Sequence, residues 1–365
     1  MFQIILFSLC LIYPNITYVD DNVFLRNLVT KNLTVKSILE NYNLVSKSKT
    51  SRILNGDRHQ EVLAFITPWN NDGYRLSVEF GSKFSIIVPV WFQLKEENGK
   101  FIIAGQDAIN ETWLAEMQKH QPHVSIVPRL IFEIHPQVFY NNFKQISEDA
   151  RLQLVKLAQQ YKFHGIFIEC PNYFFNEGTL KLLQSLAKNL RKAFRSKQSL
   201  ILMDIPSNEK FNYDDNRNKL IQKVFSSIDF AFISIYELPN QPSMAPLPAF
   251  KDLEEWLITS IGGKSISKTL LGLPMFGFDY FLNSRDYVFG NDIIEKIQKY
   301  KTNVQWIENI NEHIMFFTKE KNTHNLYYPT LYMLNNRFEK AAAEGFAGFG
   351  FWELAQGMPY FFDLL

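Results

Sequence analysis

The chain alternates short apolar, β-rich runs with stretches of helical periodicity, and this alternation constrains its fold more than any other feature. There are eight such runs, at residues 62–66, 84–92, 124–132, 165–169, 200–205, 230–236, 269–276 and 345–352. Between two of them, Leu183, Leu186 and Leu190 recur at the spacing of an amphipathic helix. Runs that are apolar on both faces and alternate with helices indicate a parallel sheet covered by helices, and eight repeats indicate closure. The pattern predicts an α/β fold, a (β/α)8 barrel.

One connection is too long for a single crossover helix. It spans about 279–328 and contains two β-rich runs, 314–318 and 325–328, on either side of polar residues. Such a pair predicts a hairpin, and a connection of this length in a compact domain usually has structure of its own. The sequence therefore predicts a small α+β insertion between strands seven and eight of a barrel that occupies residues 61–365.

The N-terminal region has the features of a secreted protein. Residues 2–11 form an apolar run that is too short to span a bilayer, as the core of a signal peptide does, and we place the signal at 1–20. A polar, irregular arm with one short helix follows at 21–60. Asn32 and Asn110 lie in Asn-x-Thr sequons, the acceptors of N-linked glycans. We expect a glycoprotein that enters the secretory pathway and has no membrane span.

Charge and motifs exclude several classes of function. The 38 basic and 37 acidic residues nearly cancel, so no overall field favours nucleic acid or an anionic membrane. The sequence has no Gly-rich phosphate loop, no clustered Cys/His spacing and no Gly-x-Ser-x-Gly elbow, so we expect no cofactor and no metal. Because Cys10 lies in the presumed signal, Cys170 has no internal partner, and its apolar neighbours predict a buried thiol.

The run at 165–169 is the most informative of the eight, because a carboxylate ends it. Phe167, Glu169 and Pro171 share one face of the predicted strand. A carboxylate on an apolar face is costly to desolvate unless it is paired or lies at a wet rim. Glu169 is therefore either a satisfied internal hydrogen-bonding group or part of a binding site.

Aromatic rings and carboxylates gather at the predicted C-terminal ends of the strands, where barrels build their sites. They are Trp69, Trp91, Glu133, Glu169, Asp204, Tyr236, Glu237 and Trp352. Aromatic rings stack on the apolar faces of pyranoses, and carboxylates accept hydrogen bonds from sugar hydroxyls. The set predicts an oligosaccharide-binding site, although a single Trp at a strand end also serves as core filling.

Several short segments of the chain are specific when they are taken together. They include Thr67-Pro68-Trp69-Asn70, Pro89-Val90-Trp91-Phe92, Leu271-Gly272-Leu273-Pro274, Tyr328-Pro329-Thr330-Leu331 and Trp352-Glu353-Leu354. Through these segments the chain resembles, from about Val62 to Leu365, the family-18 glycoside hydrolases. The strand-four motif of the family is Asp-Gly-x-Asp-x-Asp-x-Glu, and its final Glu is the catalytic acid. The motif falls on His164, Gly165, Phe167, Glu169 and Pro171. The resemblance thus implies that Pro171 replaces the acid and that no catalytic residue remains.

The same resemblance implies that the sugar cleft is kept. Tyr236 matches the strand-six tyrosine that contacts the acetamido group, and Trp352 matches the strand-eight tryptophan beneath the innermost sugar. A cleft with its rings and without its acid implies a lectin for chitooligosaccharide-type chains, secreted or in the lumen of the endolysosomal pathway. Two alternatives stay open. One is an active glycosidase that uses a displaced carboxylate, such as Glu133 or Glu237. The other is an interaction module with a vestigial cleft, since one relative is associated with a scavenger-type receptor.

Overall fold

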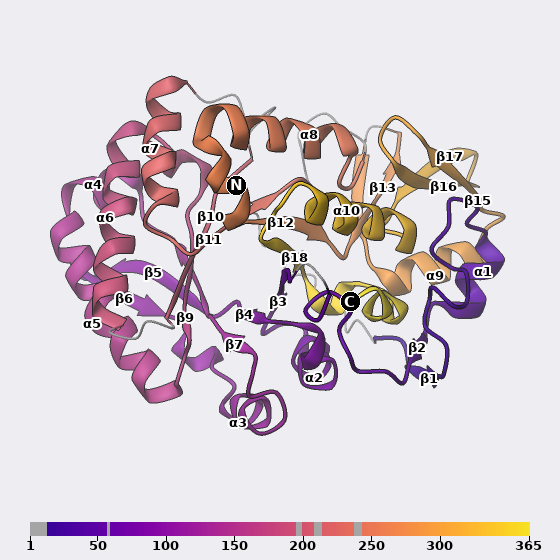
Figure 1. Cartoon of the computed structure of the whole chain (residues 1–365), viewed down its shortest axis with the longest axis horizontal. Helices are drawn as coiled ribbons and strands as arrows, with labels where there is room; N and C mark the ends of the chain where they lie inside the picture. The colour runs from indigo at the N-terminus through magenta and orange to yellow at the C-terminus, as the bar shows by residue number, and fades with distance from the viewer. Residues whose placement is uncertain (1–12, 57–58, 195–198, 208–213, 237–242, 283) are drawn as a thin grey trace.

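A closed barrel of parallel strands forms the centre of the molecule (Figure 1). The computed structural model describes residues 13–56, 59–194, 199–207, 214–236, 243–282 and 284–365. The eight strand positions are β3 (Glu61–Ile66), β4 (Ile86–Pro89) continued by β5 (Phe92–Glu97), β7 (Ser125–Ile126) continued by β8 (Arg129–Phe132), β9 (Gly165–Glu169), β10 (Leu200–Asp204), β11 (Phe230–Ser234), β12 (Thr269–Pro274) and β18 (Gly348–Trp352). Neighbouring positions pair in parallel, and β18 returns to β3 with Gly348 opposite Glu61. The predicted (β/α)8 barrel is confirmed.

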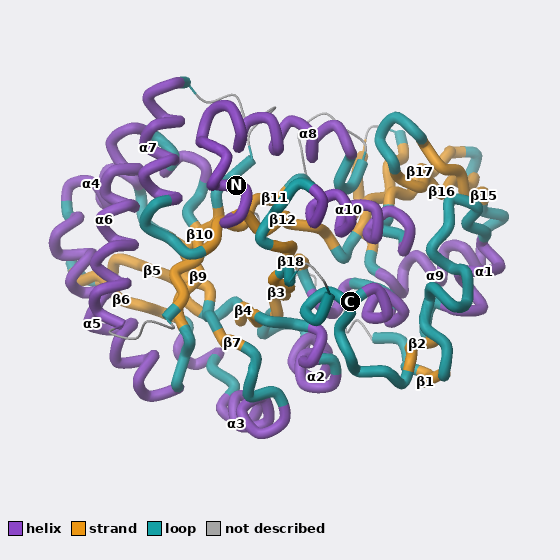
Figure 2. Tube along the Cα trace, in the orientation of Figure 1, coloured by secondary structure: helices purple, strands orange, loops and turns teal. Residues whose placement is uncertain are grey.

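Helices cover the outside of the barrel (Figure 2). They are α2 (Asn71–Glu79), α3 (Glu111–His120), α4 (Pro136–Asn141), α5 (Phe143–Tyr161), α6 (Glu177–Phe194), α7 (Asp215–Phe225), α8 (Leu247–Trp256) and α10 (Leu331–Ala343). In α6 the predicted apolar stripe, which includes Leu183, Leu186 and Leu190, is buried against the sheet. Asn176 begins this helix by accepting hydrogen bonds from the backbone N–H groups of Gly178 and Thr179 (3.0 and 3.2 Å). Within the described residues, no helix is long and apolar enough to cross a bilayer.

Side chains that point inward from the strands fill the barrel with a separate core. Its centre is an aromatic plug, formed by Phe65, Phe167 and Phe232, whose rings meet edge to face at centroid distances of 5.1 to 5.9 Å. Gly272 and Gly350 make room for the plug, because a Cβ at either position would lie 2.6 or 2.9 Å from the ring of Phe232. The outward side chains form a second core beneath the helices.

The second and third strand positions are more broken than predicted. Each position is divided into two short strands, and the two positions pair with each other at both levels, β4 with β7 and β5 with β8. β5 then continues past the barrel and turns back as β6 (Lys100–Ala104), an antiparallel hairpin. Its turn is Asn98-Gly99, with φ of 52° and 75°, as a tight hairpin turn requires. This hairpin was not predicted, although an Asn-Gly dipeptide between alternating runs is its usual signal.

The predicted insertion lies between β12 and β18. It comprises β13 (Gly277–Phe281), β14 (Ser284–Val288), α9 (Gly290–Lys299), β15 (Asn303–Ile307), β16 (Glu312–Lys319) and β17 (Asn322–Tyr327), and its strands form one antiparallel sheet. The predicted hairpin is β16–β17, with Lys319 opposite Asn322, so its turn is shorter than the polar stretch suggested. Asp279 is buried in this unit and binds Lys296 Nζ (3.0 Å) and His324 Nδ1 (2.9 Å).

The N-terminal arm has more regular structure than the sequence predicted. β1 (Thr17–Val19) and β2 (Leu44–Ser46) pair in parallel, and α1 (Val35–Asn41) lies between them in the chain. The arm packs on the C-terminal 3-10 helix, Pro359–Leu364, where Asp363 accepts from Arg26 Nη2 (3.0 Å) and from the backbone N–H of Ser46 (2.8 Å). The N-terminal and C-terminal parts of the described chain are therefore held together.

Candidate functional site

Three ionisable side chains meet above the aromatic plug: Arg129 at the start of β8, Glu169 at the end of β9 and Asp204 at the end of β10. In this charged triad, Nε and Nη2 of Arg129 donate to the two carboxylate oxygens of Glu169 (2.5 and 2.7 Å). Arg129 lies opposite Phe167 in the ladder, so its side chain reaches diagonally toward Glu169. The two side chains are only 8% and 14% exposed. Glu169 is therefore a paired internal group, the first of the two roles considered for it.

Asp204 completes the triad at the end of β10. Burial raises the pKa of its carboxyl well above the usual range, and the negative charge of Glu169 raises it further, while Arg129 lowers it. One guanidinium thus faces two carboxyls and is bound to only one of them. The protonated form of Asp204 is favoured as a result.

The end of β9 presents no free carboxyl. Phe167 is fully buried in the plug, and Glu169 is bound to Arg129. Pro171 follows the strand and precedes a 3-10 turn, Asn172–Phe174. Cys170 is a free, buried cysteine, as predicted, and burial raises the pKa of its thiol well above the ordinary value. Such a thiol is a poor nucleophile.

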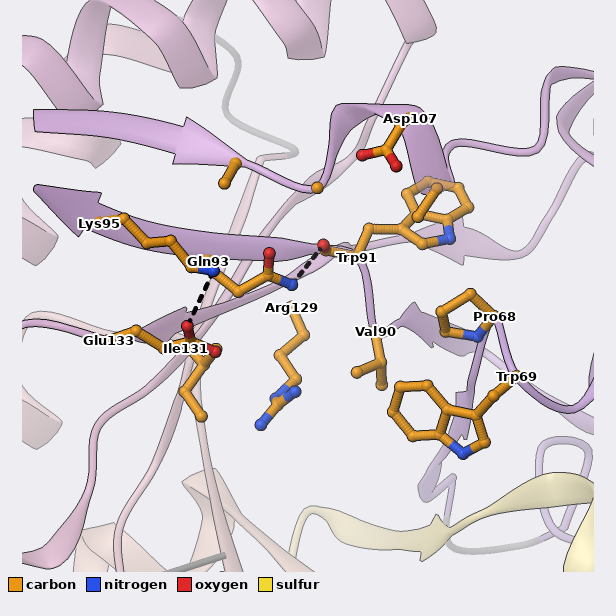
Figure 3. A pocket seen from close by; sticks show the side chains of 13 residues that line it. Pro68, Trp69, Val90, Trp91, Gln93, Lys95, Asp107, Arg129, Ile131 and Glu133 are labelled. Atoms are coloured by element: carbon orange, nitrogen blue, oxygen red, sulfur yellow. Dashed lines mark hydrogen bonds and ion pairs between the residues drawn. The ribbon is translucent and has the colours of Figure 1, made fainter. Parts of the chain in front are cut away.

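A pocket of about 400 Å³ opens beside the triad, between the end of β3, the β5–β6 hairpin and β8 (Figure 3). Its lining consists of Pro68, Trp69, Val90, Trp91, Gln93, Lys95, Ala104, Gly105, Asp107, Ala108, Arg129, Ile131 and Glu133. Gln93 lies opposite Ile131 in the ladder, and one step further along the same face Lys95 Nζ binds the Glu133 carboxylate (3.1 Å). The volume lies in the range of small-molecule sites, and the lining combines an indole with several polar groups.

The three tryptophans of the predicted site lie in different surroundings. Trp69 is 51% exposed and lines the pocket. Trp352, at the end of β18, is partly buried, with its ring 5.2 Å from that of Phe65 and 6.0 Å from the guanidinium carbon of Arg129. The ring of Trp91 is fully buried, and its Nε1 donates to the Tyr74 hydroxyl (2.8 Å). Although Trp91 is among the residues that line the pocket, its ring is too buried to stack on a sugar.

The remaining predicted residues divide between the pocket and its surroundings. Glu133 lines the pocket, and Asp204 belongs to the adjacent triad. Tyr236 is buried after β11, with its ring edge-on to Phe276 at 5.8 Å. Glu237 lies outside the described residues. Within the described part of the chain, no group of three or more His, Cys, Asp and Glu side chains could hold a metal ion.

Three charged residues of the site were not predicted, namely Arg129, Lys95 and Asp107. Arg129 carries the same signal as Glu169, since each is a lone charge in an apolar strand. Two such charges of opposite sign on consecutive predicted strands indicate an ion pair. Lys95 and Asp107 belong to the hairpin and its return loop, so they could be placed only once the hairpin was recognised.

Glu353, directly after Trp352, joins the end of the last strand to the end of the first. The residue is 1% exposed, and its carboxyl accepts hydrogen bonds from Asn70 Nδ2 (2.7 Å) and Thr67 Oγ1 (3.3 Å). Burial raises the pKa of this carboxyl to about 7, although the two hydrogen bonds act in the opposite direction.

Glu353→Gln is expected to weaken the pH dependence of folding stability. Between the pKa of an unfolded Glu, about 4.3, and the folded value of about 7, the folded protein binds more protons at Glu353 than the unfolded chain does. The stability of the wild type therefore falls as the pH rises through this window, by about 3 kcal/mol from this group. Urea unfolding at about pH 5 and about pH 8 measures the effect. The control is Glu97→Gln, at an exposed position, and equal pH slopes in all three proteins would contradict the expectation.

Comparison with known proteins finds one family model and several solved structures that match this chain. The model of the family described as "Glycosyl hydrolases family 18" matches residues 61–357. The spore cortex-lytic enzyme SleL of Bacillus megaterium is 14% identical, with a TM-score of 0.70 over 97% of this chain and 86% of that one. A class V chitinase mutant from Nicotiana tobaccum, solved in complex with NAG4, is 15% identical, with a TM-score of 0.65 over 84% and 97%. The chitinase-like agglutinin of Robinia pseudoacacia is 17% identical, with a TM-score of 0.64 over 82% and 97%. At these identities, the solved structures show a common fold.

Proposed function

Because this chain belongs to glycosyl hydrolase family 18, we propose that it is a chitinase-like lectin, which binds a chitooligosaccharide-type chain at the C-terminal face of the barrel without cleaving it. The observation that supports this most is the absence of a free carboxyl at the described end of β9, where Pro171 stands and Glu169 is bound to Arg129. Loss of a general acid typically lowers a rate by ~10²–10⁴-fold. The pocket and the exposed ring of Trp69 supply a surface on which a sugar can stack.

A degenerate site also agrees with the finer resemblance of the chain. The segments quoted from the sequence are similar to those of the chitinase domain-containing protein, also called stabilin-interacting chitinase-like protein, whose strand-four motif is degenerate too. The resemblance to that relative agrees equally with a lectin and with a ligand of a scavenger-type receptor. We favour the lectin, because the pocket gives it a location in this structure, whereas no surface feature of the described residues favours the receptor ligand.

The competing function is a glycosidase with a displaced acid, and Asp204 is the residue on which it would depend. The favoured protonated state of Asp204 suits a proton donor. Its position does not, because Asp204 lies deep beside Glu169, about 6–7 Å below the level of Pro171 along the strands. Of the two displaced carboxylates considered from the sequence, Glu133 is bound to Lys95, and Glu237 lies outside the described residues.

We also infer that the protein is secreted or delivered to the endolysosomal lumen. The apolar run at 2–11 and the sequons at Asn32 and Asn110 support this. Asn32 is exposed, while Asn110 begins α3 by accepting a hydrogen bond from the Trp113 backbone N–H (2.9 Å). A cleavage after residue 20 would remove β1 from its partner β2, so the packing favours a cut nearer Pro14.

Trp69→Ala is expected to weaken the binding of chitotetraose at least about 5-fold, since stacking on an aromatic ring contributes on the order of 1 kcal/mol. Half of the Trp69 surface is exposed, so the melting temperature is expected to change little. Isothermal titration calorimetry and a thermal melt measure the two quantities. Tyr140→Ala is the matched control, because Tyr140 is an exposed ring on α4 that does not line the pocket.

Two results would count against the proposal. Unchanged affinity of a folded Trp69→Ala variant would point to a cleft that no longer binds sugar. Release of shorter oligomers from chitotetraose by the unmodified protein, abolished in Asp204→Asn, would identify a glycosidase with a displaced acid. Chromatography of the mixture after prolonged incubation separates these outcomes.

A further inference from the structure

Two cations and two carboxylates line the pocket beside Trp69, namely Lys95, Arg129, Asp107 and Glu133, and of these only Asp107 has no partner in the described part of the chain. Its two cations are both bound, Lys95 to Glu133 at 3.1 Å and Arg129 to Glu169 at 2.7 Å. Asp107 also lines the pocket, and its exposed carboxylate has no hydrogen bond or ion pair among the described residues. One negative charge is therefore left for a ligand to neutralise.

The β5–β6 hairpin and the loop after it hold Asp107 in this position. Gly105 has a φ of 83°, and a Cβ there would lie 2.0 Å from the carbonyl oxygen of Trp91, so only glycine allows the loop to approach the strand so closely. A short 3-10 turn, Gln106–Ala108, follows, and the Gln106 side chain donates to the carbonyl of Ile103 (2.9 Å). In Figure 3, Asp107 lies on the hairpin side of the pocket, and Trp69 lies on the side of β3.

We propose that this pocket selects a sugar that carries a free, protonated amine, such as a glucosamine unit in a partly de-N-acetylated chitooligosaccharide. Asp107 is its specificity-determining residue. The inference rests on the proposed function, because it takes Trp69 as the platform for the ring. An ammonium group supplies a cationic partner for Asp107, whereas a neutral acetamido group does not. A carboxylated or phosphorylated sugar would meet the unpaired Asp107 and would have to displace Glu133 or Glu169 from its cation.

Two tetramers that differ only in their acetyl groups test the proposal. Titration calorimetry at about pH 5.5, where the amines are protonated, compares the glucosamine tetramer with chitotetraose. We expect the glucosamine tetramer to bind about 5-fold more tightly. This ratio corresponds to one charge-assisted hydrogen bond to a carboxylate that is partly exposed to solvent. Asp107→Asn is expected to remove this preference, so that the variant binds the two tetramers with affinities that agree within about 2-fold. The preference is also expected to shrink in 1 M salt, where the Debye length is about 3 Å.

The control variant is Asp215→Asn, an exposed aspartate at the start of α7 that does not line the pocket. It is expected to keep the preference. Equal affinity for the two tetramers, or a preference that survives Asp107→Asn, would overturn this inference and leave the lectin standing. Failure of both tetramers to bind would overturn the proposed function and this inference with it.

Discussion

Phe167→Asp is expected to unfold the protein or to leave it barely stable, although it introduces an aspartate at a position where the family motif has one. Phe167 is fully buried between Phe65 and Phe232, at centroid distances of 5.1 and 5.9 Å. Emptying a Phe site in a core costs about 3–5 kcal/mol, and a buried, unpaired carboxylate costs more. Arg129 lies opposite in the ladder but is already bound to Glu169. Together, the two costs approach the free energy of unfolding of a typical domain, about 5–15 kcal/mol.

Thermal unfolding followed by circular dichroism measures this effect. Phe167→Leu, which keeps the site apolar, is expected to lose only about 1 kcal/mol. Pro171→Glu is expected to fold and to remain inactive on chitotetraose, because the neighbours that would position the new acid are missing. A cooperative transition of Phe167→Asp within a few degrees of the wild type would show that the plug contributes far less than its burial suggests. If the expected result is obtained, the strand-four motif of the family cannot be restored one residue at a time, because the change at Phe167 alone removes the stability of the aromatic plug.

Arg129→Ala is expected to destabilise the protein by about 3–5 kcal/mol at neutral pH. The change leaves Glu169 buried without its cation, and Asp204 stands beside it. Removing one partner of a buried pair costs this much because the other charge stays desolvated.

Urea unfolding distinguishes this effect from a general loss of packing. The double variant Arg129→Met with Glu169→Leu, which removes both charges, is expected to recover a large part of the loss. Arg151→Ala breaks an exposed pair with Glu148 on α5 and is expected to cost less than about 0.5 kcal/mol. If Arg129→Ala unfolds at the same urea concentration as Arg151→Ala, the stability of the protein does not depend on Arg129 as the counter-charge of Glu169.

The periodicity of the sequence was sufficient to predict the barrel, because burial on both faces of a strand and on one face of a helix leaves a local pattern. The arm was underestimated for the opposite reason. Its order comes from contacts with distant residues, such as the ion pair of Arg26 with Asp363, and no local pattern reports them. The β5–β6 hairpin did leave a local signal, the turn Asn98-Gly99. The prediction lacked this hairpin because it was based on apolar runs and not on turns.

The site was predicted less completely than the fold, and Trp91 shows why. Val88 and Val90 face the inside of the barrel, so an unbroken strand would next place residue 92 inside. The break between β4 and β5 shifts the alternation, so that Trp91 and Phe92 both face the helices, while Gln93 and Lys95 line the pocket. A shift of one residue exchanges the two faces of a strand, and the sequence alone does not locate it. Glu169 was recognised as unusual, but its pairing with Arg129 could be predicted only from the register between two strands.

The closure of the barrel by β18 has a consequence for the order in which the chain can fold. Glu61 pairs with Gly348, so the first strand position finds its second neighbour only after almost all of the barrel sequence has been synthesised. Contacts between residues so far apart slow folding, because the chain must be ordered before they form. Until then one edge of β3 stays unpaired, and an open strand edge is a template for other chains. Aggregation of the nascent chain therefore competes with this last pairing.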